Sequence, residues 1–459
     1  MSSGLRMLDP HPRRSIAVVV GLTDAAGRGR LALRGHGTPV RRTRTTGTPT
    51  AKGTGMGTGG RVTVVGIGAD GWSGLTPGAR EAVEAADVVL GSPRQLDLLP
   101  ESLTATPRAW PSPLVAALPG LFAELADRSV CALASGDPMF FGIGATLARV
   151  LGPDRLRVVP APSSVALACA RLGWPAEDVD VVSVVGRPLA RIRRALAPGR
   201  RLIVLSAGAE SPAEIAALLD GDGWGPSALA LLEQLGGPRE RVLAGHASDW
   251  PHPPGDALNL VAVSCEAAPG ARVLGETAGL PDDVYDHDGQ LTKREVRAVT
   301  LALLGPRAGE LLWDVGAGAG SIAIEWMRAH PSCRAVAVES HLDRVAAISH
   351  NADALGVPGL RVVSGRAPGA LTDLPTPDAV FIGGGVTGDG VLDTCLAALR
   401  PGGRLVANTV TVEAEGVLAA AHARLGGTLT RLSVARAGAV GGFTGWRPAM
   451  PVTIWSVTP

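Results

Sequence analysis

The chain has 459 residues, of which 46% are hydrophobic and 19% are charged, and its formal net charge is +1 at pH 7. This length suggests two or three domains, and the composition is that of a globular protein able to bury a core. The near-neutral charge argues against nucleic acid as the main partner, because phosphate binding requires a basic surface. No apolar run approaches the ~18 residues of a membrane-spanning helix, so we expect no membrane partner.

Residues 1–60 differ from the rest of the chain in charge. They hold ten Lys and Arg residues against two acids, a balance of +8, whereas the remainder holds 33 basic and 40 acidic residues, a balance of −7. The segment is rich in Arg, Gly, Thr and Pro, so we expect a disordered basic tail and assign it no function. The five cysteines are scattered without a C-x-x-C pair, which indicates reduced thiols in a cytoplasmic protein.

A buried-type strand over 61–65 leads into Gly66-Ile67-Gly68-Ala69-Asp70-Gly71, the letters of a dinucleotide-binding loop. Such a loop should open directly into a helix. Here residues 72–76 intervene, and we expect the next helix to begin only near Pro77. The following strand, over 88–90, ends in Gly-Ser rather than in an acid that binds a ribose. The context therefore argues against a nicotinamide site.

A second glycine-rich loop, beginning Ser135-Gly136-Asp137, follows an apolar strand over 130–134. Taken alone, it indicates either a close approach to a ligand or a plain strand-to-helix turn. Ser163 and Ser164 precede a helical pattern over 165–172, where one of them is expected to cap the helix. Further strands are predicted over 181–185, 201–205, 228–232 and 258–263.

Composition changes at residues 266–270, and a polar stretch extends to Gln290, so we place the main domain boundary there. Helical and strand patterns then alternate. Helices are predicted over 293–304, from 321, over 342–355 and up to 400, and strands over 311–315, 335–338, 360–363, 379–382 and 404–407. Strict alternation predicts a parallel sheet with helices on both faces, whose ligand site lies at the carboxyl ends of the strands.

The most informative motif lies where the strand over 311–315 carries Asp314 into the alternating glycines of Gly316–Gly320. Glycines let backbone and ligand approach closely, and the helix from Ser321 points its free N–H groups over the loop. Glu339 ends the next strand, where a carboxylate can accept both ribose hydroxyls. Asp314 could hold a ligand ammonium group. This set favours S-adenosylmethionine (SAM), and the alternative is a Gly-rich turn of some other α/β domain.

Two metal-binding patterns can be rejected. Residues 284–295 imitate a calcium loop, but Val284 at its first position has no side-chain oxygen and Pro281 breaks the entering helix. His287 has no cysteine or second histidine at zinc-ligand spacing. We predict no metal site. His287 and its flanking acids either line a pocket beside the glycine loop or belong to a solvated turn.

Longer motifs resemble known families. Residues 285–459 resemble the decarboxylating precorrin methyltransferases of cobalamin biosynthesis, through the run DHDGQLTKREVR at 286–297, the Asp314 loop, Gly365-x-Ala367-Pro368 and Phe381–Gly385. Residues 61–266 resemble the tetrapyrrole methylases, through residues 65–68, 75–76, 86–91, 135–138 and 163–164. The fused order resembles bifunctional enzymes that methylate C5 and C15. It implies a two-lobed class III methylase fold over 61–266, a linker over 267–284 and a Rossmann-like class I methyltransferase fold over 285–459.

The resemblance implies two SAM sites, one in each domain. In the C-terminal domain the implied cofactor residues are Thr292, Gly316, Ala317, Gly318, Ala319, Gly320, Glu339 and Ala367, and in the N-terminal domain they are Ser135, Gly136, Asp137, Ser163 and Ser164, with Gly66 and Gly68 on the tetrapyrrole side. The implied reaction converts precorrin-6B to precorrin-8X. The N-terminal half would methylate C5, and the C-terminal half would methylate C15 and remove CO₂ from the C12 acetate.

The substrate carries many carboxylates, and Lys293, Arg294 and Arg297 are candidates to pair with them, although surface ion pairing on a helix is the alternative for Arg297. His287 and Glu295 are candidate catalytic proton-transfer groups. Two other functions remain open: an RNA or protein methyltransferase with an accessory domain, and a non-catalytic SAM-binding scaffold. Relatives of the C-terminal type imply a homo-oligomer, with a tetramer formed through that domain.

Overall fold

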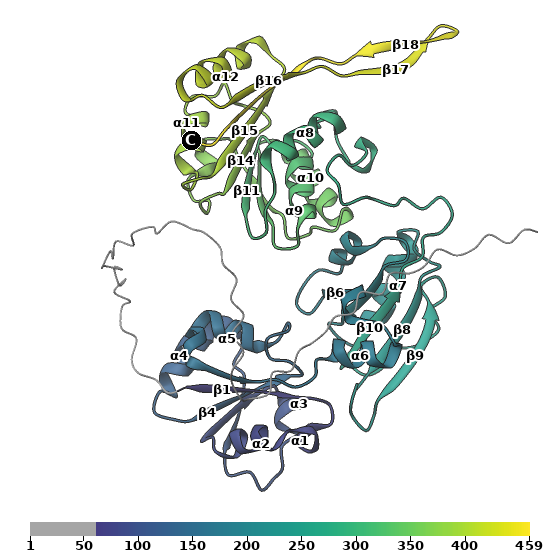
Figure 1. Cartoon of the computed structure of the whole chain (residues 1–459), viewed down its shortest axis with the longest axis vertical. Coiled ribbons are helices and arrows are strands. Elements are labelled where there is room, and N and C mark those ends of the chain that lie inside the picture. The colour runs from purple at the N-terminus through teal and green to yellow at the C-terminus, as the bar shows by residue number, and fades with distance from the viewer. Residues whose placement is uncertain (1–60) are drawn as a thin grey trace, which may run out of the picture. The chain divides into compact units, whose positions relative to one another are not determined.

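A computed structural model describes residues 61–459 (Figure 1). The tail predicted over 1–60 lies outside the described residues. Within the described part, three main sheets build two lobes of an N-terminal domain and one C-terminal domain. None of the helices described there has the length and apolar character needed to cross a membrane.

The first lobe has a five-stranded, fully parallel sheet in the order β3-β2-β4-β1-β5. Its strands are β1 (Val62–Ile67), β2 (Val88–Gly91), β3 (Thr106–Ala109), β4 (Val130–Ser135) and β5 (Leu156–Val159), and its helices are α1 (Gly71–Gly74), α2 (Pro77–Glu84), α3 (Pro93–Leu96), α4 (Leu114–Glu124) and α5 (Ile143–Leu151). Val64 and Leu133 are fully buried, as the continuous apolar runs of central parallel strands require. One expectation was wrong: the short helix α1 precedes the helix predicted from Pro77.

The second lobe has a mixed sheet in the order β6-β7-β10-β8-β9, in which only β6 and β7 are parallel. Its strands are β6 (Val179–Ser183), β7 (Arg201–Leu205), β8 (Ala228–Glu233), β9 (Arg241–His246) and β10 (Asn259–Ser264), and its helices are α6 (Ser164–Leu172) and α7 (Ser211–Gly221). Strand β9 was not predicted. It is a short edge strand whose side chains are mostly exposed, and its apolar stretch is only three residues long.

The C-terminal domain has a seven-stranded sheet in the order β13-β12-β11-β14-β15-β19-β16. Its strands are β11 (Leu311–Val315), β12 (Arg334–Glu339), β13 (Arg361–Ser364), β14 (Ala379–Ile382), β15 (Arg404–Thr409), β16 (Thr428–Leu432) and β19 (Val452–Val457), and its helices are α8 (Arg294–Leu304), α9 (Ser321–Ala329), α10 (Leu342–Ala354), α11 (Val391–Ala398) and α12 (Val412–Leu425). The first five strands are parallel, as predicted. Strand β19 is antiparallel to both of its neighbours, β15 and β16, and neither β19 nor β16 was predicted.

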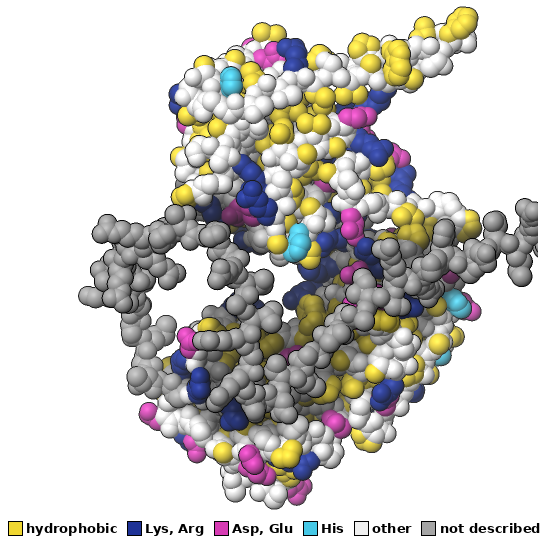
Figure 2. Space-filling view, viewed as in Figure 1, with side chains coloured by type: hydrophobic (Ala, Val, Ile, Leu, Met, Phe, Trp, Pro, Cys, Tyr) yellow, Lys and Arg dark blue, Asp and Glu magenta, His cyan; other side chains and the backbone are white. Residues whose placement is uncertain are grey.

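A two-stranded hairpin, β17 (Ala435–Val440) and β18 (Phe443–Pro448), is inserted between β16 and β19. It extends away from the body of the C-terminal domain (Figure 1). Its side chains include Phe443 and Trp446, which are 84% and 76% exposed, and apolar atoms are visible along it in Figure 2. Apolar surface of this kind commonly marks a contact with another molecule.

The cysteines lie inside the three cores. All five are buried and free: Cys131, Cys169, Cys265, Cys333 and Cys395. Burial raises the pKa of the Cys131 and Cys395 thiols to about 12. These thiols are therefore protonated and behave as small apolar side chains.

Candidate functional site

A pocket of about 940 Å³ opens at the carboxyl ends of the parallel strands of the C-terminal sheet. Its walls come from the glycine loop after β11, the end of β12, residues 289–293 and the three glycines Gly383–Gly385 after β14. Strand order reverses between β11 and β14, which is where α/β sheets bind their ligands. The pocket therefore lies where the sequence predicted it.

The alternating glycines have a steric cause. Gly316, Gly318 and Gly320 have φ values of 70°, 59° and 76°, which favour glycine. A Cβ atom on Gly316 would lie 2.8 Å from the carbonyl oxygen of Gly384, and one on Gly318 would lie 2.7 Å from that of Gln290. The loop is thus closely packed between two neighbouring backbones.

Glu339 is 5% exposed, and its carboxylate is held at this loop. Its Oε2 accepts a hydrogen bond from the Gly318 amide at 2.9 Å. Its Oε1 accepts from the amides of Ser340 and His341, at 2.8 and 3.0 Å. The residue also lines the pocket, so an oriented acidic group stands beside a loop with room for a ligand backbone. This arrangement fits a nucleoside with vicinal hydroxyls.

Asp314 is 1% exposed and is not among the residues that line the pocket. Its Oδ2 accepts a hydrogen bond from the Ala323 amide at 3.0 Å, whereas the buried Oδ1 has no partner among the described residues. Burial, the largest cause, raises the pKa of this carboxyl to about 7. Its role in holding an ammonium group stays a prediction.

The pocket brings together several residues that the sequence proposed. Those lining it are Thr292, Lys293, Glu295, Gly316, Ala317, Gly318, Glu339 and Ala367. Ala319 and Gly320 do not line it; Ala319 packs into the core instead. His287 also lies outside the lining, and its Nδ1 is 3.0 Å from the Gly289 amide.

Two predicted substrate contacts need correction. Arg297 is fully buried, and its Nε donates to Glu325 Oε1 at 2.6 Å, so it is neither a pocket cation nor part of a surface ion pair. Arg294 is exposed outside the pocket lining and donates to the Gly279 carbonyl at 2.8 Å. A signal for Arg297 was present: it shares a helical face with Leu301 and Leu304, at spacings of four and seven.

The pocket is also lined by basic residue types that the sequence analysis missed, namely His341, Arg344, Arg366 and Arg436. Arg366 closely follows the carboxyl end of a predicted strand. Because ligand sites of parallel sheets lie at these ends, its position is a signal that the sequence contains. Arg436 comes from the unpredicted hairpin and pairs with Glu295. This pair lowers the pKa of the Glu295 carboxyl, which disfavours Glu295 as a proton donor.

In the N-terminal domain, the ends of β1, β4 and β5 meet. A Cβ on Gly66 would collide with the carbonyl oxygen of Gly136 and lie 2.7 Å from the Ala161 amide. Gly136 has a φ of 59°, and a Cβ there would lie 3.1 Å from Ser163 Cα. Three predicted site residues are thus in direct backbone contact. Gly68 is not part of this backbone contact: a Cβ there would collide with the side-chain carboxylate of Asp70.

The polar side chains at these strand ends have defined partners. Ser163 accepts a hydrogen bond from the Ala166 amide at 3.1 Å as the N-cap of α6, and Ser164 is its first residue. Asp137 Oδ1 accepts from the Met139 amide at 2.8 Å. Ser135 Oγ accepts from Arg94 Nη2 at 2.9 Å and from Gln95 Nε2 at 3.1 Å, two residues that the sequence analysis missed. Burial lowers the pKa of the Arg94 guanidinium.

No group of three or more His, Cys, Asp and Glu side chains placed to hold a metal occurs within residues 61–459.

Comparison with known proteins gives two family matches on separate parts of the chain. The family described as tetrapyrrole (corrin/porphyrin) methylases matches residues 61–250. The family described as precorrin methyltransferase domain matches residues 283–459. The chain therefore contains both types of methyltransferase domain, in the order that the sequence motifs indicated.

Individual relatives agree. A Sinorhizobium protein named precorrin-6Y C(5,15)-methyltransferase (decarboxylating) is 50% identical over 401 residues, which cover 86% of this chain and 96% of that protein. Two shorter relatives are each 33% identical and cover 39% of this chain. They are the Salmonella typhimurium cobalt-precorrin-7 C(5)-methyltransferase, covered to 88%, and a probable cobalt-precorrin-6B C(15)-methyltransferase (decarboxylating) of Pyrobaculum calidifontis, covered to 94%. The chain belongs to the family of precorrin-6Y C(5,15)-methyltransferases (decarboxylating).

Proposed function

We propose that the chain methylates C5 and C15 of precorrin-6B and removes CO₂ from the C12 acetate, giving precorrin-8X in cobalamin biosynthesis. The observation that carries the proposal is the near full-length relationship to a protein named for both methylations and the decarboxylation. The pocket geometry supports it, because a glycine loop and an oriented carboxylate meet at the ends of parallel strands. We place the activity in the cytoplasm, in keeping with five cysteines that form no disulfide.

Methyltransferases of this family use SAM as methyl donor. We place one donor site in each domain. In the C-terminal domain the glycine loop and Glu339 would hold the nucleoside, since both line the pocket and the Gly318 amide orients the carboxylate. In the N-terminal domain the donor would lie against Gly136 and Ser163, where backbones from three strand ends approach one another.

SAM carries its own leaving group, so the protein's task is to orient the reacting atoms and exclude water. Lys293 and Arg366 line the pocket, and neither makes an ion pair with another described residue. They are suited to bind substrate carboxylates. A Cβ at Gly384 or Gly385 would meet nothing within 4 Å, which leaves space for a broad ring.

We assign C5 methylation to the N-terminal domain and C15 methylation with decarboxylation to the C-terminal domain. The shorter relatives support this division, because each is named for one of the two methylations and matches a stretch of single-domain length.

The test is to incubate the protein with methyl-labelled SAM and precorrin-6B and follow product mass and released CO₂. We expect two labelled methyl groups and one CO₂ per substrate. Label appearing in RNA or protein instead would favour a different methyltransferase, and SAM binding without transfer would favour a scaffold.

We also propose a homo-oligomer, with a tetramer formed through the hairpin β17–β18. Phe443 and Trp446 on this hairpin are among the most exposed large apolar side chains described. Light scattering of Trp446→Glu should then show smaller particles than the unmodified protein. Val412→Glu is the matched control, because Val412 is 80% exposed on α12. A monomeric unmodified protein would refute the oligomer and leave the methylation proposal intact.

A further inference from the structure

One wall of the C-terminal pocket is a segment without regular strands, residues 279–292, which we call the strap. Its last residues, Gly289–Thr292, line the pocket. Part of it falls in the predicted linker over 267–284, yet Leu280 and Tyr285 are buried in the C-terminal core. The carbonyl of Gln290 lies 2.7 Å from where a Cβ on Gly318 would be, so strap and glycine loop pack backbone to backbone.

A single side chain outside the pocket joins these two segments. Asn351, on α10, is 1% exposed. Its Oδ1 accepts a hydrogen bond from the Asp286 amide at 2.8 Å. Its Nδ2 donates to the carbonyl of Asp286 at 2.9 Å and to that of Ala319, in the glycine loop, at 3.0 Å. No simple apolar residue could replace these three hydrogen bonds, because the backbone groups would be left unpaired.

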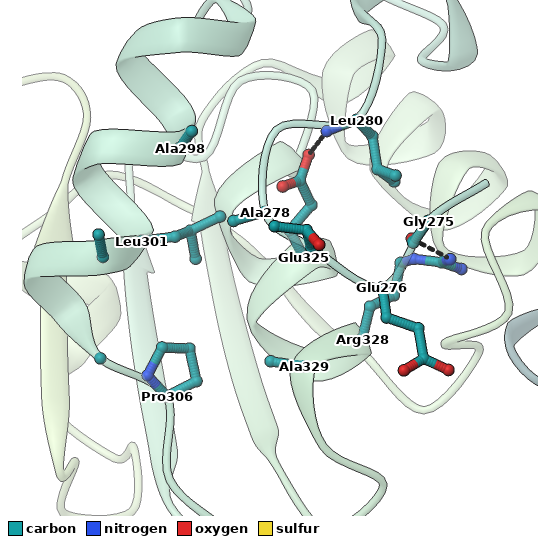
Figure 3. A pocket seen from close by; sticks show the side chains of 13 residues that line it. Gly275, Glu276, Ala278, Leu280, Ala298, Leu301, Pro306, Glu325, Arg328 and Ala329 are labelled. Atoms are coloured by element: carbon teal, nitrogen blue, oxygen red, sulfur yellow. Dashed lines mark hydrogen bonds between the residues drawn. The ribbon is translucent and has the colours of Figure 1, made fainter. Parts of the chain in front are cut away.

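A buried ion pair fixes both ends of the strap. Glu325, on α9, accepts from the amides of Gly279 and Leu280 at 2.6 and 3.0 Å; Figure 3 shows the second of these bonds. Arg297, on α8, pairs with Glu325 and donates through Nη1 to the carbonyl of Thr292 at 2.5 Å. Arg297 also donates to the carbonyl of Leu280. The pair thus connects the first and last residues of the strap.

Leu280, Tyr285 and Leu291 of the strap pack into the core, but the packing is incomplete where the strap begins. A second cavity, of about 470 Å³, lies under residues 275–280 and is lined on its other side by residues such as Ala298, Leu301 and Glu325 (Figure 3). Cavity walls lack the dispersion contacts of a close-packed core. The hydrogen bonds of Asn351, Arg297 and Glu325 therefore add to this packing in fixing the position of the strap.

We propose that Asn351 and the Arg297–Glu325 pair are positioning residues for the C-terminal SAM site, acting through the strap on Thr292 and Gly318. The inference rests on the proposed function. When the strap is displaced, a smaller fraction of the protein can bind the donor. The apparent Kd for SAM then equals the intrinsic Kd divided by that fraction. Chemistry at saturating donor is then largely retained.

The experiment compares Asn351→Ala and Arg297→Lys with the unmodified full chain. CO₂ release reports only the C-terminal half, and C5 methylation of the separately supplied C15-methylated, decarboxylated compound serves as a reference for the N-terminal half. For Asn351→Ala we expect the KM for SAM in CO₂ release to rise roughly 10- to 100-fold, as for lost supporting contacts around a binding site, with less change in kcat. C5 methylation should be unchanged. Arg297→Lys keeps the charge opposite Glu325 and should give a smaller rise.

Arg404→Lys is the matched control, because Arg404 makes a largely buried pair with Glu310 at 2.6 Å and does not line the pocket. It should leave the KM for SAM unchanged. An unchanged KM in Asn351→Ala, or an equal rise in Arg404→Lys, would overturn the inference. Absence of CO₂ release and SAM binding in the unmodified protein would instead refute the proposed function.

Discussion

The carboxylate of Glu339 accepts a hydrogen bond from the amide of Gly318 at 2.9 Å, which joins the end of β12 to the middle of the glycine loop. The remaining oxygen is held by the amides of Ser340 and His341. The hydroxyl of Ser340 adds a longer hydrogen bond to Oε1, at 3.4 Å. The acid is therefore oriented mainly by backbone amides, and no ion pair with a described cation neutralises it.

Glu339→Gln should weaken donor binding in the C-terminal domain. The amide keeps the shape, but it removes the charge and offers only one acceptor oxygen. Hydrogen bonds to charged groups are worth about 1.5–3 kcal/mol, so the KM for SAM measured by CO₂ release should rise about 10- to 100-fold. Glu310→Gln, outside the pocket, is the control. A KM equal to that of the unmodified protein would exclude Glu339 from the donor site.

Gly318→Ala should abolish CO₂ release from precorrin-6B, with little loss of C5 methylation when the C15-methylated, decarboxylated compound is supplied as substrate. The added Cβ would lie 2.7 Å from the Gln290 carbonyl at a φ of 59°, so loop and strap must separate. Gly416→Ala is the control, because its Cβ would meet nothing within 4 Å and alanine favours helix α12. Product mass spectrometry and thermal unfolding check both variants; normal CO₂ release by Gly318→Ala would contradict the packing argument.

Gly66→Ala should impair the N-terminal half and leave the C-terminal half active. Its Cβ would collide with the Gly136 carbonyl in the N-terminal domain, so we expect loss of C5 methylation and retention of CO₂ release. The product should then carry one new methyl group and lack the acetate carboxyl. Gly78→Ala, with open space around the new Cβ, should make the normal product. Loss of CO₂ release in Gly66→Ala would show that the two halves do not act separately.

Asp314 should make stability depend on pH. Its pKa is about 7 in the folded chain against an ordinary value of 3.8. Between these values the folded chain keeps a proton that the unfolded chain releases, so this group's contribution to stability falls as pH rises from about 4 to 7 and is then constant. Urea unfolding should show the unmodified protein losing stability relative to Asp314→Asn between pH 5 and 7.5. A difference that does not change with pH would contradict the buried, unpartnered Oδ1.

Much of the fold and of the C-terminal pocket could be predicted, because the features that form them are encoded in short stretches of sequence. Strand ends, glycine spacing and the acid at Glu339 follow from short patterns, and these patterns predict the edge of the sheet at which the pocket opens. Ser163 as the N-cap of α6 was likewise one of two adjacent candidates.

The remainder depends on contacts distant in sequence. Arg436 reaches Glu295 from 141 residues away, on a hairpin whose strands have exposed side chains and no buried stripe. Asn351 looks like a surface residue of α10 until its partners at Asp286 and Ala319 are known. Arg297 is charged, yet it lies on the apolar face of α8 and is fully buried, so its charge alone predicts the wrong environment.

The five buried cysteines are distributed so that their reactivity can report local opening of each core. One thiol lies in the core of the first lobe, two lie in the second and two in the C-terminal domain, all shielded from solvent. A thiol reagent would modify each only when that region opens. Alkylation rates followed peptide by peptide would therefore measure the opening of the three cores separately, without any introduced probe.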